Sequence, residues 1–163
     1  RYRSQIIYET PQEKIEKRRP IIIQRSEMPF YRTSELKMED IGTGNPGEYQ
    51  PILGELMKAG VVTYYRGTGT KPHWHNVDEQ FFYVTEGKCL FLLGEEEKHI
   101  EEGDIVYIPR GTLHVGRSTT DKCVIWTTKS PAEEPSLGAD HHYPENMQEI
   151  IDGLEKRAEA LYE

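Results

Sequence analysis

Residues 71–87, KPHWHNVDEQFFYVTEG, contain the pattern that decides the fold. His73 and His75 are two residues apart, so a strand would turn both imidazoles to the same face. Glu79 and Gln80 follow, and because they are adjacent, only one of them can share a strand face with the histidines. Imidazole is a common ligand of Zn, Fe, Cu and Ni. The stretch therefore predicts part of a metal site. The phase of the strand decides whether Glu79 or Gln80 is a further ligand.

Short apolar runs rich in β-branched and aromatic residues recur around this stretch, separated by turn signals. No helical pattern lies between them, which favours an all-β sandwich or barrel. The runs are residues 61–65, 81–84, 89–93, 104–109 and 123–128. We therefore expect a β-barrel over residues 51–129. An extension of edge strands and loops over residues 1–50 precedes it, and a loop with a helix follows over residues 130–163.

A third histidine, His114, follows a second segment rich in turn signals. Residues 105–108 have the pattern of a strand that ends at Pro109, and Gly111 permits a tight bend before the chain returns. Three histidines contributed by two separate hairpins are what a metal site inside a small barrel requires.

These segments resemble the two sequence motifs of the cupin family over about residues 60–128. The first motif has the order Gly, five residues, His, one residue, His, three or four residues, Glu, six residues, Gly. Here it reads Gly67, His73, His75, Gln80 and Gly87. The second motif has the order Gly, five residues, Pro, one residue, Gly, two residues, His, three residues, Asn. Here it reads Gly103, Pro109, Gly111, His114 and, in place of Asn, Ser118.

The resemblance implies a double-stranded β-helix, or jelly-roll barrel, with one divalent metal bound by His73, His75, His114 and a fourth ligand. With a four-residue spacing the fourth ligand is Gln80, and the motif then ends correctly at a glycine. A three-residue spacing would select Glu79, but the position where the glycine should follow holds glutamate. We expect Gln80, because its strand phase also turns an apolar wall inward, and Glu79 stays the alternative.

The identity of the fourth ligand changes the chemistry. Three neutral imidazoles and an amide would leave both positive charges of the metal uncompensated, which makes a stronger Lewis acid and attracts an anionic substrate. A carboxylate from Glu79 would lower the charge of the site and favour a redox metal, as in the dioxygenases of the family. A nitrogen-rich set of ligands suits Fe, Ni, Zn and Cu. If Glu79 is the fourth ligand, the set also suits Mn.

The resemblance further implies an enzyme that acts on a small, anionic molecule by dioxygenase, isomerase or lyase chemistry. We expect Glu79 or Tyr64 to move a proton beside the metal. Arg66 shares a face with Tyr64 by alternation and would suit a substrate carboxylate. The alternative function is a barrel that binds a small molecule or a sugar without turnover. His141 and His142 lie in a loop and are expected at the surface.

Composition excludes several other classes of protein. The net charge of −8 over 163 residues argues against a nucleic-acid surface. No apolar run approaches the roughly 20 residues that cross a bilayer. Cys89 and Cys123 lie in strand-like apolar contexts and are expected to be small buried side chains, which favours a reducing, cytoplasmic location.

The C-terminal segment has a helical pattern. Apolar residues recur at one-face spacing after Pro144, at Met147, Ile150, Ile151, Leu154, Ala158 and Leu161. This stripe predicts a helix that packs on the barrel or on a second copy of the chain. Together with edge strands near the N-terminus, it leads us to expect a homodimer.

Overall fold

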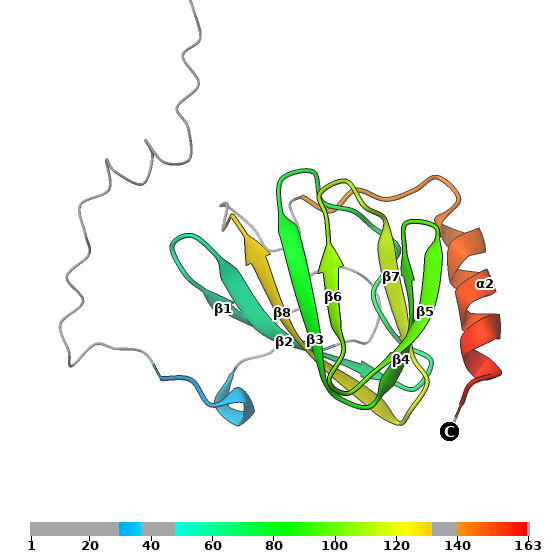
Figure 1. The fold of residues 1–163 in the computed structure, drawn as a ribbon, viewed down its shortest axis with the longest axis horizontal. Helices are drawn as coiled ribbons and strands as arrows, with labels where there is room; N and C mark the ends of the chain where they lie inside the picture. The colour runs from blue at the N-terminus through cyan, green and yellow to red at the C-terminus, as the bar shows by residue number, and fades with distance from the viewer. Residues whose placement is uncertain (1–29, 37–47, 132–139, 163) are drawn as a thin grey trace, which may run out of the picture. The chain divides into compact units, whose positions relative to one another are not determined.

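The computed structural model of the protein describes residues 30–36, 48–131 and 140–162. Most of the predicted N-terminal extension lies outside these residues. The described part of the chain forms β-strands, a short 3-10 helix and a C-terminal α-helix (Figure 1). The elements are η2 (Thr33–Glu35), β1 (Glu48–Leu53), β2 (Lys58–Tyr65), β3 (Glu79–Glu86), β4 (Lys88–Leu93), β5 (Glu96–Glu101), β6 (Ile105–Ile108), β7 (His114–Ser118), β8 (Lys122–Ser130) and α2 (Met147–Glu159).

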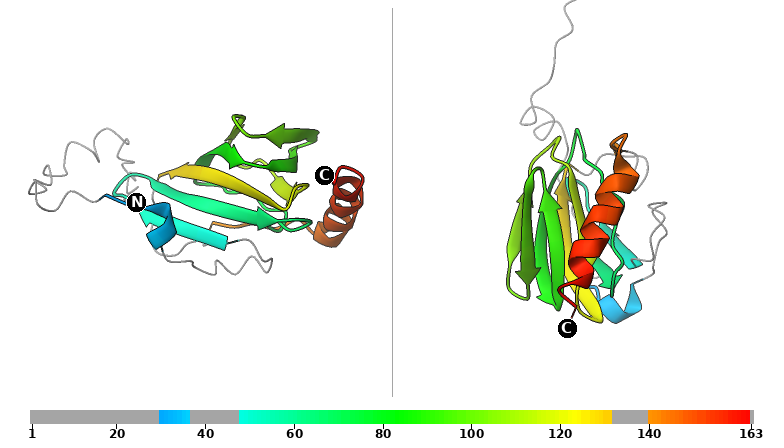
Figure 2. Two further views of the ribbon diagram at one scale, coloured as in Figure 1. Left: turned by 90° about the horizontal axis from the view of Figure 1, so that it is seen from below. Right: turned by 90° about the vertical axis from the view of Figure 1, so that its right-hand side faces the viewer.

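Within the described residues, the strands form two antiparallel sheets that face each other (Figure 2). One sheet has five strands in the order β1-β2-β8-β3-β6, and the other has three in the order β5-β4-β7. Strands that are neighbours in space are thus often distant in sequence, as β2 and β8 are. The prediction of an all-β jelly-roll barrel with a C-terminal helix is confirmed.

Burial along β3 follows a strict alternation. Gln80, Phe82 and Val84 are buried, whereas Phe81 and Tyr83 are 47% and 44% exposed. Because side chains of a strand point alternately to its two faces, the buried set faces the barrel interior. The strand phase expected from the sequence is therefore the one observed, with Gln80 inward.

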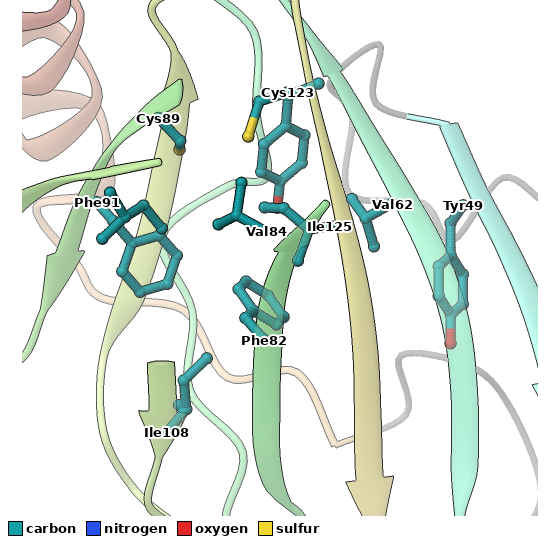
Figure 3. Packing of buried hydrophobic residues seen from close by; sticks show 11 residues of the cluster. Tyr49, Val62, Phe82, Val84, Cys89, Phe91, Ile108, Cys123 and Ile125 are labelled. Carbon is teal, nitrogen blue, oxygen red and sulfur yellow. The ribbon is translucent and has the colours of Figure 1, made fainter. Parts of the chain in front are cut away.

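The core fills the space between the two sheets (Figure 3). Phe82 of the five-stranded sheet meets Phe91 of the three-stranded sheet edge to face, with ring centroids 5.6 Å apart, a favourable aromatic geometry. Cys89 and Cys123 are both free thiols and fully buried, as predicted. The core reaches the histidines, since the rings of Phe82 and Phe91 each have a centroid 6.5 Å from that of His114.

Helix α2 covers the outer face of the three-stranded sheet (Figures 1 and 2). Leu154 and Ala158 are completely buried there against Leu90 and Val115. The apolar stripe therefore packs on the barrel of the same chain. No helix in the described residues is long and apolar enough to span a membrane.

Candidate metal centre

An antiparallel backbone bridge joins the two motif segments at His73 and His114. The His73 N–H donates to the His114 carbonyl at 3.2 Å, and the His114 N–H donates to the His73 carbonyl at 2.9 Å. Two residues along, the Gly111 N–H donates to the His75 carbonyl at 2.6 Å. Gly111 has a φ of +69°, a conformation that glycine adopts without strain. The bridge places the rings of His73 and His114 side by side, with centroids 4.3 Å apart.

Backbone carbonyls fix the tautomers of these two histidines. Nδ1 of His73 is 2.7 Å from the Lys71 carbonyl, and Nδ1 of His114 is 3.0 Å from the Thr112 carbonyl. Because a carbonyl only accepts, each Nδ1 carries the proton and each Nε2 keeps its lone pair. Nε2 of His114 is buried and has no hydrogen-bond partner. Both rings thus present an Nε2 lone pair, which is the kind of donor that a metal binds.

Gln80 offers an oxygen to the same pocket. Its amide nitrogen donates to the Thr127 hydroxyl at 2.7 Å, and its Oε1 is buried without a partner. Glu79 lies on the other face of β3, where its carboxylate accepts a hydrogen bond from the Tyr107 hydroxyl at 2.9 Å. The predicted role of Glu79 beside the metal is therefore corrected, because strand phase turns this side chain out of the barrel.

Tyr64 and Arg66, expected on one face, separate in the structure. Tyr64 is buried and lines the pocket, and burial raises the pKa of its hydroxyl above the ordinary value. Arg66 lies beyond the end of β2, where strand alternation no longer holds. It pairs with Asp121 at 2.7 Å, and its guanidinium lies 5.3 Å from the ring centroid of Tyr162. The expected place of Arg66 near a substrate carboxylate is therefore corrected.

His141, expected at the surface, instead lies at the histidine cluster. Its ring centroid is 4.4 Å from that of His73 and 4.7 Å from that of His75. Ligand atoms of these three residues all lie within 4.8 Å of one another. Residue spacing carries no signal for His141, because a contact between segments distant in sequence brings it into place.

A buried lysine, Lys129, was also missed by sequence reasoning. Its Nζ lies 2.8 Å from Nε2 of His75, and burial lowers its pKa to about 7. A signal did exist, because Lys129 has the same strand phase in β8 as the inward-facing Ile125 and Thr127. A second lysine of the pocket, Lys58, is paired with a buried aspartate.

The histidines of the pocket stay neutral at neutral pH. Burial, aided by the nearby charge of Lys129, lowers the pKa of His73 to about 4 and that of His141 to about 3. Burial likewise lowers the pKa of His75 and His114 below the ordinary value. Neutral imidazole is the form that binds metals. With the free oxygen of Gln80, this donor set fits a divalent first-row transition metal.

Fold and site together define a jelly-roll barrel whose interior carries a cluster of metal-ligating side chains. Residues 60–128 match the family model described as "Cupin domain". The protein belongs to the cupin superfamily, as the two motifs indicated.

The chain is also similar to a relative in sequence and to solved structures in fold. An uncharacterized protein of Aquifex aeolicus is 35% identical over 110 residues, which are 64% of this chain and 91% of that protein. The polyketide cyclase RemF from Streptomyces resistomycificus has a similar structure, with a TM-score of 0.62, 19% identity, and coverage of 83% of this chain and 99% of that one. KdgF from Halomonas sp. has a TM-score of 0.58, with 22% identity and coverage of 65% and 96%.

Proposed function

We propose that this protein is a metal-dependent cupin enzyme that binds a small anionic molecule at a divalent metal inside the barrel. The proposed ligands are His73, His75, His114 and Gln80. The observation that carries the proposal is a pair of buried atoms without partners, Nε2 of His114 and Oε1 of Gln80. Buried polar atoms are rarely left unpaired, and a metal ion would satisfy both.

Charge in the pocket supports an anionic substrate. The four proposed ligands are neutral, so the charge of a divalent metal would be uncompensated. The carboxylate of Asp78 is occupied by Lys58 at 3.2 Å. Asp140 accepts hydrogen bonds from the N–H groups of Val77 and Asp78 at 2.7 and 3.3 Å. In its protonated form Lys129 adds a positive charge beside His75, so a carboxylate at the metal would find a second cation within the same pocket.

When bound, the metal would supply Lewis-acid polarisation of a substrate oxygen. Lys129 would hold the anionic group, and Tyr64, which burial keeps protonated, would donate a hydrogen bond rather than act as a base. Dioxygenase, isomerase and lyase reactions are all compatible with such a centre. The fold of a polyketide cyclase resembles this one, which supports an enzyme by analogy.

The proposal is tested first by metal content and anion binding. We expect about one equivalent of a divalent metal by elemental analysis, in keeping with one centre per barrel. Oxalate, used as a probe in titration calorimetry, should bind the metal-loaded protein and not the chelator-treated protein. Lys129→Met should weaken oxalate binding by at least about tenfold, since charge-assisted contacts are the strong ones. Lys122→Met, at the exposed end of the same strand, is the matched control.

Each outcome has a defined meaning. Failure of the wild-type protein to bind metal after reconstitution overturns the proposal. Oxygen-uptake assays with carboxylic acids, catechols and thiols then separate dioxygenase activity from isomerase or lyase activity. Saturable anion binding without any turnover would favour the alternative, a cupin that binds a small molecule or a sugar without catalysis.

A homodimer stays a prediction. Since α2 uses its apolar face on its own barrel, the expectation depends on exposed sheet edges and on family resemblance. Light scattering at micromolar concentration checks it, and a monomer mass would contradict it.

A further inference from the structure

We infer that His141 is an additional ligand of the metal centre, supplied by a segment outside the barrel motifs. The inference rests on the proposed metal site and deepens it. His141 lies C-terminal to the region that the cupin model matches, which ends at residue 128. Its ring is as close to those of His73 and His75 as these are to each other, with centroid distances of 4.4 and 4.7 Å against 4.9 Å.

The backbone on both sides of His141 is anchored to the barrel. On one side, Oδ2 of the Asp140 carboxylate accepts hydrogen bonds from the N–H groups of Val77 and Asp78 at 2.7 and 3.3 Å. On the other side, His142 and Trp74 exchange two backbone hydrogen bonds of 3.0 Å each. These contacts hold His141 over the pocket before any metal arrives, which is how a preorganised ligand is built.

The two adjacent histidines have different surroundings. His142 is 43% exposed, with Nε2 on Asp140, and its ring stacks on Trp74 at a centroid distance of 5.8 Å. Nδ1 of His141 is buried and has no hydrogen-bond partner. An unpaired buried imidazole nitrogen beside two other histidines is explained if a metal binds it.

A fifth protein ligand changes what the centre can accept. Each protein ligand takes a position on the ion that substrate or water would otherwise use, so a fifth ligand would leave less of the metal open to an anionic molecule. The ion would also join the C-terminal segment to the barrel, because its ligands would come from both.

The test compares His141→Ala with His142→Ala as the matched control. The affinity for Zn(II) is measured by competition with a chelator, and the coordination of Co(II) by its visible absorption spectrum. His141→Ala should weaken Zn(II) binding by about ten- to a hundredfold, at least the loss that follows removal of a ligand's hydrogen-bond partner. It should also change the Co(II) spectrum, while His142→Ala should leave that spectrum unchanged. Thermal melting of the chelator-treated variants checks that both fold.

Hydrogen exchange gives a second readout that does not depend on activity. Zn(II) should slow exchange of the His142 amide in the wild-type protein and should not do so in His141→Ala. If the wild-type protein binds no metal, the proposed function fails. If it binds metal and His141→Ala keeps both the affinity and the Co(II) spectrum, the proposed function stands and the ligand role of His141 is overturned. Equal changes of the Co(II) spectrum in both variants would also overturn it.

Discussion

Nζ of Lys129 lies 2.8 Å from Nε2 of His75, inside the pocket that the histidines line. The lysine therefore contacts one ring nitrogen of a proposed metal ligand, and its positive charge would repel a cation at that place. The same charge attracts an anion. Lys129 should therefore weaken metal binding and strengthen anion binding.

Lys129→Met should change the two affinities in opposite directions. Without the ammonium, Zn(II) should bind about tenfold more tightly to the metal-free protein, because a competing hydrogen bond and a like charge are removed. Oxalate should bind the loaded variant more weakly than it binds the loaded wild type. Chelator competition measures the first effect and calorimetry the second. A variant that loses affinity for both ligands would show that Lys129 has a structural role instead.

The stability of the metal-free protein should rise between pH 5 and pH 9. An unfolded histidine binds a proton below pH 6.5, while folded His73 stays neutral down to about pH 4, so acid favours the unfolded chain in that window. For this one histidine the effect amounts to about 3 kcal/mol at pH 4. Lys129 adds to the rise in stability at higher pH. Its pKa is 10.5 in the unfolded chain and about 7 in the folded protein, so between these pH values the unfolded chain binds more protons.

Thermal melting with a chelator, at several pH values, measures this dependence. Lys129→Met should lose the part of the rise above pH 7, and Lys122→Met should keep it. A melting temperature of the wild-type protein that falls steadily from pH 5 to pH 9 would contradict the prediction.

Metal content should depend on Gln80 and not on Glu79. Gln80→Ala removes the inward oxygen, so we expect loss of most of the bound metal, whereas Glu79→Ala removes only a hydrogen bond on the outer face of the sheet. Gln80→Glu should retain metal and weaken oxalate binding, because a carboxylate cancels one positive charge of the centre. Elemental analysis of the variants, purified side by side, checks the first pair. Loss of metal from Glu79→Ala would mean that the observed strand phase is not the one in solution.

Much of the barrel could be predicted because its strands carry apolar residues at a period of two. Strand β5 was harder to predict, since Ile100 is its only buried residue and its first residues have the composition of a turn. Strand β1 crosses the predicted boundary at residue 50 and contains Pro51, which is tolerated because β1 is an edge strand. Strands with little burial therefore carry a weak sequence signal even where their backbone pairing is regular.

The candidate site likewise contains residues that could be placed from the sequence and residues that could not. Residues fixed by local spacing, such as His73 and Gln80, could be placed from strand phase alone. His141 could not, because its position depends on backbone pairing between segments far apart in sequence. Arg66 was misplaced for a related reason, since alternation was extended one residue past the end of β2.

Glu155→Ala should destabilise the protein without changing its metal affinity. Arg117 is completely buried between the barrel and α2, where its Nε donates to Glu155 at 3.2 Å and its Nη1 donates to the Thr70 and Gly116 carbonyls at 2.8 Å each. Removing Glu155 leaves the guanidinium without its carboxylate. Hydrogen bonds to charged groups contribute about 1.5–3 kcal/mol. We expect a loss near the lower end of this range, because Glu155 is itself 41% exposed and solvent screens the pair.

Urea unfolding measures this loss, and Glu159→Ala, an exposed acidic residue of the same helix, is the control. The control should stay within about 0.5 kcal/mol of the wild-type protein. Because Glu155 lies on α2 and is not among the residues that line the histidine pocket, Zn(II) affinity should be equal in both variants. A Glu155→Ala protein as stable as the control would mean that the backbone carbonyls alone are enough to hold the buried guanidinium, and that α2 is kept in place by Leu154 and Ala158.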